Sequence, residues 1–313
     1  MVDLDGDGLL DIYVANDLKP AYLFHNQGGG RFAEKAVLAG CGLDVSGSEV
    51  AGMGIDAGDL DGSGRPSLFV TNFQNRPNML YVNEGGLHFR ESSFAAGLAG
   101  PSLSRLKFGT AFLDADLDGN LDIAVANGHI QRNNDRIGGN PTAQEAQLFT
   151  GDGRGHFRDV SDRAGAYFKE RYVGRGLAWA DFDNDGKPDL AFSHNAGPVA
   201  LLHNRTETTN HWLGLELVGD GKKSNRNAVG ARVEIECSQA KQTRFVNGGG
   251  SYLSANDRRV LAGLGSADRA GRVTVTWPSG RKQEFRDLEA GRWYRLTEGQ
   301  EQPAAAGPRK LIK

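Results

Sequence analysis

The chain has 313 residues, of which 36 are basic and 39 acidic, and its formal net charge is -3. This length suits one large domain or two ordinary ones with a substantial core. Because no basic block occurs, the composition argues against a nucleic-acid-binding surface. No apolar stretch approaches the roughly 18 residues of a membrane helix, and the acidic start MVDLDGDGLL lacks the pattern of a signal peptide.

Glycine is over-represented: the 44 glycines are about twice the number expected for this length. They follow no collagen-like period, so they predict many tight turns and an all-β chain of short strands. Two cysteines, Cys41 and Cys237, lie far apart in the sequence. We expect both to be small core residues, although a disulfide between them stays open.

One acidic pattern of nine residues occurs four times, 56, 55 and 67 residues apart. Acidic or hydroxyl residues stand at positions 1, 3, 5 and 9, and glycine stands at position 6. Each copy leads into a strand-like apolar segment, and a unit of about 55 residues has the size of a propeller blade. The copies are DLDGDGLLD at 3–11, DLDGSGRPS at 59–67, DADLDGNLD at 114–122 and DFDNDGKPD at 181–189.

Two further features recur in each unit. Gly54, Gly109 and Gly176 stand five residues before their loops, in what reads as the preceding strand. A phenylalanine recurs as Phe32, Phe89 and Phe157, and we expect it to anchor the core of each blade. The counterpart of Gly54 in the first copy would precede residue 1, so the first blade should lack its leading strand. We therefore expect an open arc of blades, or further repeats upstream of a truncated or miscalled start.

Carboxylates at alternate positions of a tight turn converge and repel one another unless a cation lies between them. Ca²⁺ accepts six to eight oxygen ligands in a flexible geometry, whereas zinc and copper prefer nitrogen or sulfur ligands absent from these loops. Position 7 would contribute a backbone carbonyl, so its side chain is free to vary. The predicted Ca²⁺ ligands are Asp3, Asp5, Asp7, Leu9 and Asp11; Asp59, Asp61 and Ser63; Asp114, Asp116, Asp118, Asn120 and Asp122; and Asp181, Asp183, Asp185, Lys187 and Asp189.

These loops differ from EF-hands, which close on a bidentate glutamate at position 12. Position 12 is apolar in all four copies: Val14, Val70, Val125 and Phe192. The second loop carries Ser63 and Ser67 where the others have aspartate. We expect it to bind Ca²⁺ weakly or not at all.

The repeats occupy residues 1–205, and the sequence pattern changes after them. Leu213, Leu215 and Leu217 alternate with Gly214 and Glu216, and similar alternation recurs around residues 233–237 and 273–277. Alternation of this kind predicts half-buried strands. We therefore expect a β-sandwich over 206–300 and a disordered tail over 301–313.

The chain resembles a known family at this point. The acidic repeats are similar to FG-GAP/VCBS repeats, as in the integrin α-subunit propeller. The stretches NHWLGLELVG, NAVGARVEIE, NGGGSYLSANDRR and VTVTWPSG resemble the ASPIC/UnbV domain, and the pairing is that of the cartilage acidic protein family. The resemblance implies a seven-bladed, Ca²⁺-binding propeller in exported proteins, hence a secreted, periplasmic or cell-surface location.

The sequence contains no GxSxG, HExxH or strand-to-helix GxGxxG motif of an enzyme. The seven histidines are scattered, and the triple glycine at 248–250 reads as a tight turn between strands. The longer third spacing holds a polar insertion over 128–147, whose residues either contact a glycan or protein or form a tolerated loop. Its candidate contacts are Arg132, Asn133, Asn134, Asp135 and Arg136.

We therefore expect a Ca²⁺-binding, non-catalytic propeller module that binds an extracellular protein or polysaccharide. The alternatives are a propeller-type glycan lyase or hydrolase, and a scaffold whose binding segment lies elsewhere. A pocket that gathered His129, His156 and carboxylates from outside the loops would favour the enzyme.

Overall fold

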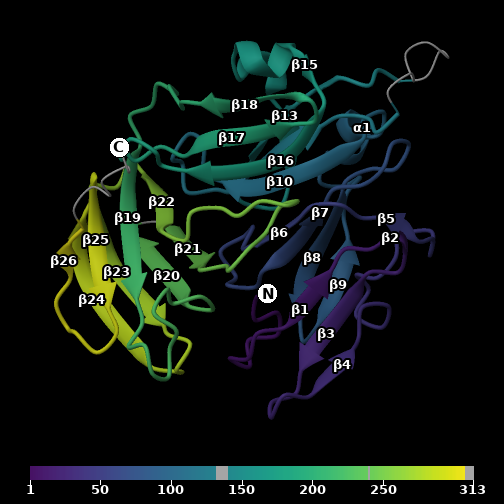
Figure 1. The fold of residues 1–313 in the computed structure, drawn as a ribbon. Coiled ribbons are helices and arrows are strands. Elements are labelled where there is room, and N and C mark those ends of the chain that lie inside the picture. The colour runs from purple at the N-terminus through teal and green to yellow at the C-terminus, as the bar shows by residue number, and fades with distance from the viewer. Residues whose placement is uncertain (132–139, 239, 307–313) are drawn as a thin grey trace.

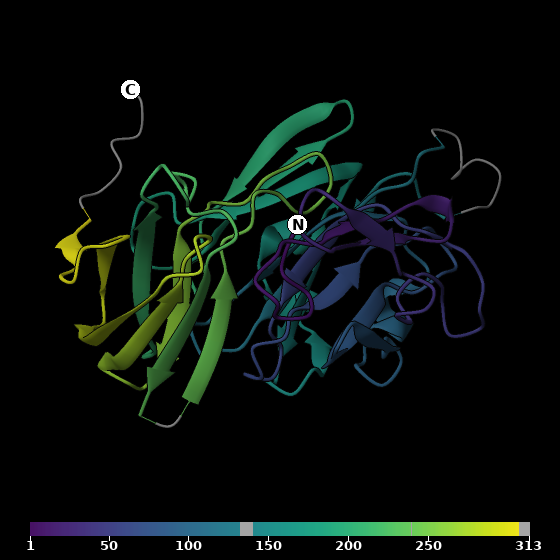
Figure 2. The ribbon, with the colours of Figure 1, turned by 90° about the horizontal axis from the view of Figure 1, so that it is seen from below.

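The computed structural model, which describes residues 1–131, 140–238 and 240–306, contains many short strands and only a few helical turns. Each acidic repeat belongs to a small antiparallel sheet, and the four sheets follow one another in an arc that does not close into a ring (Figure 1). A separate two-sheet sandwich lies beside the arc (Figure 2). The all-β prediction of an open propeller followed by a sandwich is confirmed.

Two of the four blades are complete. Blade 2 has the order β6-β7-β8-β9 and blade 3 the order β10-β11-β13-β14, whereas blades 1 and 4 have three strands each. Blade 1 lacks its leading strand, as predicted. The strands are β1 (Ile12–Val14), β3 (Tyr22–Asn26) and β4 (Phe32–Glu34) in blade 1; β6 (Ile55–Gly58), β7 (Ser67–Val70), β8 (Met79–Gly85) and β9 (His88–Glu91) in blade 2; β10 (Lys107–Leu113), β11 (Asp122–Asn127), β13 (Gln147–Gly151) and β14 (Phe157–Asp159) in blade 3; and β16 (Gly174–Ala180), β17 (Asp189–His194) and β18 (Gly197–Leu202) in blade 4.

Short ribbons and turns join the blades. Strand β2 (Asp17–Lys19) pairs with β5 (Val50–Ala51), which leads into blade 2, and β12 (Gln144–Glu145) pairs with β15 (Arg171–Tyr172), which leads into blade 4. The helical turns α1 (Ala99–Ser102), η2 (Ser161–Arg163) and η3 (Ala166–Lys169) follow the fourth strands of blades 2 and 3.

The recurring glycines let neighbouring inner strands approach closely. A Cβ at Gly54 would collide with the carbonyl of Phe108 in blade 3, and a Cβ at Gly109 would lie 2.5 Å from the Leu177 nitrogen in blade 4. Any side chain at either position would push the blades apart. The recurring glycines at these two positions therefore indicate that neighbouring blades pack closely.

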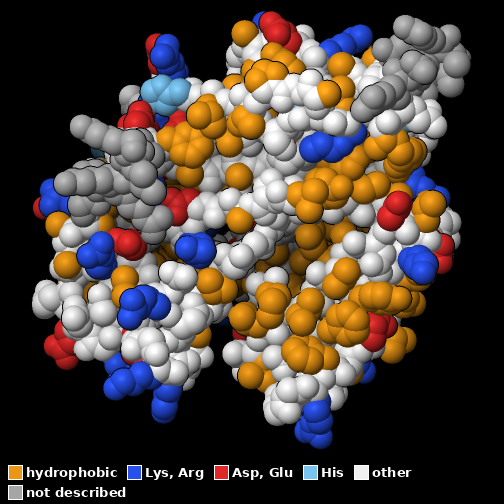
Figure 3. Space-filling view, viewed as in Figure 1, with side chains coloured by type: hydrophobic (Ala, Val, Ile, Leu, Met, Phe, Trp, Pro, Cys, Tyr) orange, Lys and Arg blue, Asp and Glu red, His pale blue; other side chains and the backbone are white. Residues whose placement is uncertain are grey.

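The expectation for the recurring phenylalanine holds for two blades and is wrong for the first. Phe89 and Phe157 are buried between blades, but Phe32 is 43% exposed. Each buried ring packs against a turn of the preceding blade, and among the described residues no blade precedes blade 1. Hydrophobic side chains accordingly gather on the surface over the first blades (Figure 3).

The sandwich buries its own core between two four-stranded sheets, in which the predicted alternating residues point inward. Strand β19 pairs antiparallel with β22 and parallel with β25. The first sheet contains β22 (Val260–Gly265), β19 (His211–Val218), β25 (Arg292–Thr297) and β26 (Ala304–Ala305); the second contains β21 (Ala240–Phe245), β20 (Arg232–Cys237), β23 (Arg269–Thr276) and β24 (Lys282–Glu289).

The tail differs in part from the disordered segment predicted over 301–313. Ala304 and Ala305 form β26 on the open edge of β25, where two small side chains fit without steric conflict. Residues 307–313 lie outside the described part of the chain. Cys41 and Cys237 are both free thiols, so no disulfide joins them. Cys41 is buried as expected, whereas Cys237 is only partly buried at the end of β20, so the expectation of a core residue is wrong there.

The loop over residues 247–258, called here the inserted loop, carries the sandwich into the centre of the arc. The triple glycine 248–250 belongs to this loop, so the prediction of a tight strand turn there is wrong. Ser251 exchanges backbone hydrogen bonds with Ile55 of blade 2. Its hydroxyl accepts the Thr110 N–H of blade 3 at 3.1 Å and donates to the Leu177 carbonyl of blade 4 at 2.7 Å.

Replacing Ser251 with alanine should lower the free energy of unfolding by about 1–3 kcal/mol, because a buried N–H and a buried carbonyl lose their partner. Urea unfolding followed by tryptophan fluorescence measures this loss. The exposed Ser46→Ala variant is the control and should change stability by less than about 0.5 kcal/mol. Equal stability of both variants would show that the inserted loop does not hold the blades.

Candidate metal centres

The four acidic loops lie at one end of the blades, against the sandwich. A Cβ at Gly62 in the second loop would lie 2.6 Å from the Lys241 carbonyl, and one at Gly119 in the third would lie 3.4 Å from the Gly263 carbonyl. Gly186 of the fourth loop is covered by the Trp212 ring. Loops and sandwich therefore form a single junction.

Position 1 has the same contact in every loop. One oxygen of its carboxylate accepts the N–H of the position-6 glycine, which bends the chain around the carboxylate. The distances are 2.9 Å for Asp3 and Gly8, 2.8 Å for Asp59 and Gly64, 3.0 Å for Asp114 and Gly119, and 2.9 Å for Asp181 and Gly186. This repeated bond explains why the register of the motif is strict.

The residue at position 9 links each loop to its sheet by hydrogen bonds. Asp122 accepts the Ala115 N–H at 2.8 Å with one oxygen and the Gly151 N–H of β13 at 2.9 Å with the other. Asp11 and Asp189 make the equivalent pairs of bonds. In the second loop, the Ser67 hydroxyl accepts only the strand N–H, that of Asn83 at 3.1 Å.

Three of the four loops bring carboxylates together tightly enough to hold a metal ion. In each cluster one ligand atom per residue lies within 4.8 Å of the others. The clusters are Asp3, Asp5 and Asp7; Asp114, Asp116 and Asp122; and Asp181, Asp183 and Asp189. Asp118 and Asp185 border the last two, where each accepts the N–H of position 7, Asn120 or Lys187. In the first loop Asp7 does the same for Leu9.

The third loop gives the strongest sign of a missing cation. Asp114 is buried, and its Oδ1 atom has no hydrogen-bond partner, although its Oδ2 atom accepts the N–H groups of Gly119 and Gly263. A buried oxygen without a partner is costly. A divalent cation between Asp114, Asp116 and Asp122 would satisfy it, so the residues present fit the expected metal.

Burial also shifts the acidity of these groups. It raises the pKa of Asp114 to about 7 and the pKa of Asp122 to about 8, with neighbouring carboxylates adding to the effect. In the fourth loop, burial raises the pKa of Asp181 to about 6. Burial therefore disfavours the ionised form of these three carboxylates, and a bound cation would offset that cost.

The second loop is organised differently. Asp59 and Asp61 form no cluster of three with another described acid, histidine or cysteine. A Cβ at Gly64 would collide with the guanidinium of Arg232 from the sandwich, so a positive group already borders this loop. Its geometry supports the expectation of weak Ca²⁺ binding, which stays a prediction.

Two histidines join the clusters, and the sequence reasoning missed them. The imidazole of His25 lies 3.2 Å from Asp11 and 3.6 Å from Asp5, and that of His203 lies 3.0 Å from Asp183. His25 lies in β3, and His203 directly follows β18, the third strand of blade 4. The available signal was a His-Asn pair whose histidine stands 14 residues after the position-9 aspartate in both repeats.

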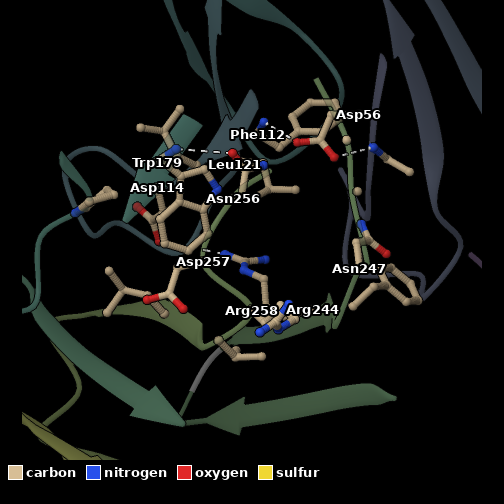
Figure 4. Close-up of a pocket in the computed structure, with 18 of the residues that line it drawn as sticks. Asp56, Phe112, Asp114, Leu121, Trp179, Arg244, Asn247, Asn256, Asp257 and Arg258 are labelled. Atoms are coloured by element: carbon tan, nitrogen blue, oxygen red, sulfur yellow. Dashed lines mark hydrogen bonds and ion pairs between the residues drawn. The ribbon is translucent and has the colours of Figure 1, made fainter. Parts of the chain in front are cut away.

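A small cavity lies at the junction, between the blades and the inserted loop. Figure 4 shows Asp56, Phe112 and Trp179 of the blades around this cavity, with Arg258 of the inserted loop and with Asn256, which accepts the Trp179 N–H at 3.1 Å. Burial raises the pKa of Asp56 to about 6, while two backbone N–H groups bind its carboxylate. The cavity volume of about 90 Å³ is far below the roughly 300–1,000 Å³ of typical ligand pockets.

The two histidines that would have favoured an enzyme make separate contacts. His129 is buried and packs edge-on against Phe73, whereas His156 lies in an exposed turn, 3.2 Å from Asp152. The candidate contact residues Arg132, Asn133, Asn134, Asp135 and Arg136 lie outside the described residues.

The chain matches two protein families. Residues 3–70 and 114–192 match the FG-GAP-like repeat, and residues 221–303 match ASPIC and UnbV. Two curated relatives, cartilage acidic protein 1 of Mus musculus and of Homo sapiens, are each 28% identical over 62% of this chain. The matched region spans only 29% and 28% of their lengths.

Solved structures resemble the chain more distantly. A lectin of Agrocybe aegerita that recognises non-reducing terminal N-acetylglucosamine is 19% identical, with a TM-score of 0.38 over 92% of this chain and 65% of its own. The V. cholerae biofilm matrix protein Bap1 is 14% identical, with a TM-score of 0.33 over 91% of this chain and 47% of its own. Likenesses at this level do not identify a ligand.

Replacing Asp116 with asparagine should weaken Ca²⁺ binding in the third loop at least tenfold, because the cluster loses one of its three anionic ligands. Isothermal titration calorimetry should show one fewer tight site. The Asp61→Asn variant makes the same change at position 3 of the second loop and should leave the number of tight sites unchanged. Equal effects of the two variants would contradict the distinction between these loops.

Proposed function

We propose that this chain, a protein of FG-GAP-like repeats with a C-terminal ASPIC and UnbV domain, is a Ca²⁺-stabilised and non-catalytic binding module. The unpartnered, buried Oδ1 atom of Asp114 carries the proposal. It lies in one of three carboxylate clusters that repeat in the same register, and Ca²⁺ is the cation that best matches an all-oxygen set of this kind.

The position of the clusters supports a structural role for Ca²⁺. In the third loop, Asp114 also accepts the Gly263 N–H and lies 3.7 Å from Arg244, both of the sandwich. In the fourth loop, the guanidinium of Arg259 donates to Asn184 and to the Asp181 carbonyl. Ca²⁺ at these loops would therefore fix the orientation of the blades relative to the sandwich.

We infer an extracellular setting and a protein or polysaccharide partner. The Ca²⁺ sites of extracellular modules have dissociation constants of about 10⁻⁴–10⁻³ M and remain occupied in that setting. Among the described residues, no helix is long and apolar enough to cross a membrane. The rigid blades would present their connecting loops as the binding surface.

The geometry favours binding over glycan hydrolysis or lysis. In the third and fourth loops, the carboxylates with raised pKa accept backbone N–H groups of their own blade. The cavity beside Asp56, a further acid with a raised pKa, is too small for a sugar chain. His129 and His156, the candidate bases, make unrelated contacts.

Thermal unfolding in Ca²⁺ and in excess chelator tests the metal. Binding to the native state alone adds about 2.7 kcal/mol per site at a hundredfold excess over the dissociation constant, so three sites add roughly 8 kcal/mol. The midpoint should rise in Ca²⁺ and not in equimolar Mg²⁺. An unchanged midpoint, with no Ca²⁺ found by elemental analysis, would overturn the proposal.

Partner binding needs its own assay. Retention of the chain on immobilised extracellular polysaccharides and matrix proteins should occur in Ca²⁺ and be lost in chelator. Incubation with the same polysaccharides should release no reducing ends or unsaturated products. Release of such products by the wild-type chain would establish the lyase or hydrolase instead.

A further inference from the structure

Blade 4 lacks the outer strand that the complete blades have. In blades 2 and 3 the third strand pairs with a fourth, β9 or β14, but no described strand pairs with the outer edge of β18. Figure 1 shows β18 as the outermost strand of its sheet. Leu201 of β18 is the counterpart of Leu23, Leu80 and Leu148 in the other blades, because each of these leucines pairs with the residue two places after position 9 of its loop.

The backbone of those counterparts shows what is missing. The carbonyl of Leu80 accepts the Ser92 N–H at 2.8 Å, and its N–H donates to the Ser93 hydroxyl at 2.9 Å. Leu148 of blade 3 makes the same two bonds, with Val160 and Ser161. Both sets of partners follow directly on the fourth strand. The backbone edge of β18 at Leu201 is therefore open, whereas the fourth strand and the residues after it cover the equivalent edge in blades 2 and 3.

In the complete blades, the fourth strand also contacts a turn of the preceding blade. In blade 2 the Phe89 N–H donates to the Ala39 carbonyl of blade 1 at 2.7 Å, and in blade 3 the Phe157 N–H donates to the Ala96 carbonyl of blade 2 at 2.8 Å. The glycine after each alanine, Gly40 or Gly97, lies too close to the phenylalanine carbonyl for any Cβ.

Blade 3 carries this turn as well, at Ala164 and Gly165. Here a Cβ on Gly165 would meet nothing within 4 Å, although its φ of 109° keeps the left-handed backbone of Gly40 and Gly97. The receiving turn is therefore present and the phenylalanine it would receive is absent.

The space between this turn and β18 is an apolar groove of about 600 Å³. Its lining reproduces, one blade further on, the cluster that buries Phe157. That cluster includes Leu60, Leu80, Ala96, Leu98, Leu121, Ile123 and Phe149. The equivalent positions in blade 4 and its neighbour are Ala115, Leu148, Ala164, Ala166, Pro188, Leu190 and Leu202, and all seven line the groove.

We propose that this groove binds an extended peptide strand whose phenylalanine fills it and whose acidic residue follows two positions later. The chain itself defines this pattern, as His88-Phe89-Arg90-Glu91 in blade 2 and as His156-Phe157-Arg158-Asp159 in blade 3. By the register of blade 3, where Phe157 pairs with Gly151, the phenylalanine stands opposite Asn204. Added strands of this kind gain affinity from main-chain hydrogen bonds and specificity from the side-chain pocket.

The described residues hold no spare strand of this pattern. Strands β4, β9 and β14 each pair with the third strand of their own blade. The residues outside the described part, 132–139, 239 and 307–313, contain no phenylalanine. We therefore assign the occupant to a second polypeptide of different sequence.

Fluorescence anisotropy with a labelled peptide that copies residues 153–161, GRGHFRDVS, tests the proposal on the intact chain. The peptide should bind saturably, and serine in place of its phenylalanine should weaken binding at least tenfold. The Leu202→Glu variant should also bind at least tenfold more weakly, because Leu202 lines the groove in the place that Phe149 takes beside Phe157. Leu38→Glu changes a leucine of blade 1 that is 81% exposed and should bind normally.

Hydrogen exchange gives a second readout, since bound peptide should slow amide exchange in residues 197–202 at least tenfold. Absence of both saturable binding and protection would overturn the proposal, as would equal binding of the serine peptide. Dimerisation of the free chain in sedimentation, lost in Leu202→Glu and not reversed by the peptide, would identify a self-association face instead and equally overturn it.

Discussion

The three-way contact of Ser251 is the interaction on which the rest of the structure depends. One residue of the sandwich reaches the inner strands of blades 2, 3 and 4 through Ile55, Thr110 and Leu177. In an arc that does not close, the inner strands have no ring to hold their ends together. The inserted loop supplies that constraint from another part of the chain, so blades and sandwich depend on each other.

The acidic loops add a second constraint at the same junction. Asp114 and the Asp181 carbonyl are each held by groups of the sandwich as well as by their own turns. Burial disfavours the charged form of Asp114, and a cation bound there would offset this cost. Because the same carboxylate accepts the Gly263 N–H of the sandwich, binding of the proposed cation would be coupled to docking of the two domains.

Sequence reasoning succeeded where short-range chemistry determines the structure. The contact between a position-1 carboxylate and its glycine is local, so four copies of the motif were enough to predict the loops, the strands after them and the missing strand of blade 1. Gly54 and Gly109 were visible as a repeat, although their role in blade spacing needed the structure. The alternating leucines of β19 predicted the sandwich correctly for the same local reason.

Long-range contacts were not predictable in this way. The triple glycine at 248–250 looked like a local turn because nothing near it in sequence reveals the blades it enters. Phe32 matches Phe89 in its repeat, yet it is exposed because its environment depends on a neighbouring blade. His25 and His203 approach their loops from a later segment of the blade, so only their equal spacing from the loop could have revealed them.

The parallel pairing of β19 with β25 has a mechanical consequence. Strand β19 receives the chain from the blades, and β25 lies near the end of the sandwich, so tension along the polypeptide pulls the two strands in opposite directions. Six residue pairs, from Leu213 and Arg292 to Val218 and Thr297, lie in register between them. Such a load acts along the strands and strains their hydrogen bonds together, in shear, whereas a hairpin pulled at its open end would unzip one bond at a time. A load between the blades and the C-terminal end of the sandwich would therefore be shared by all six pairs at once.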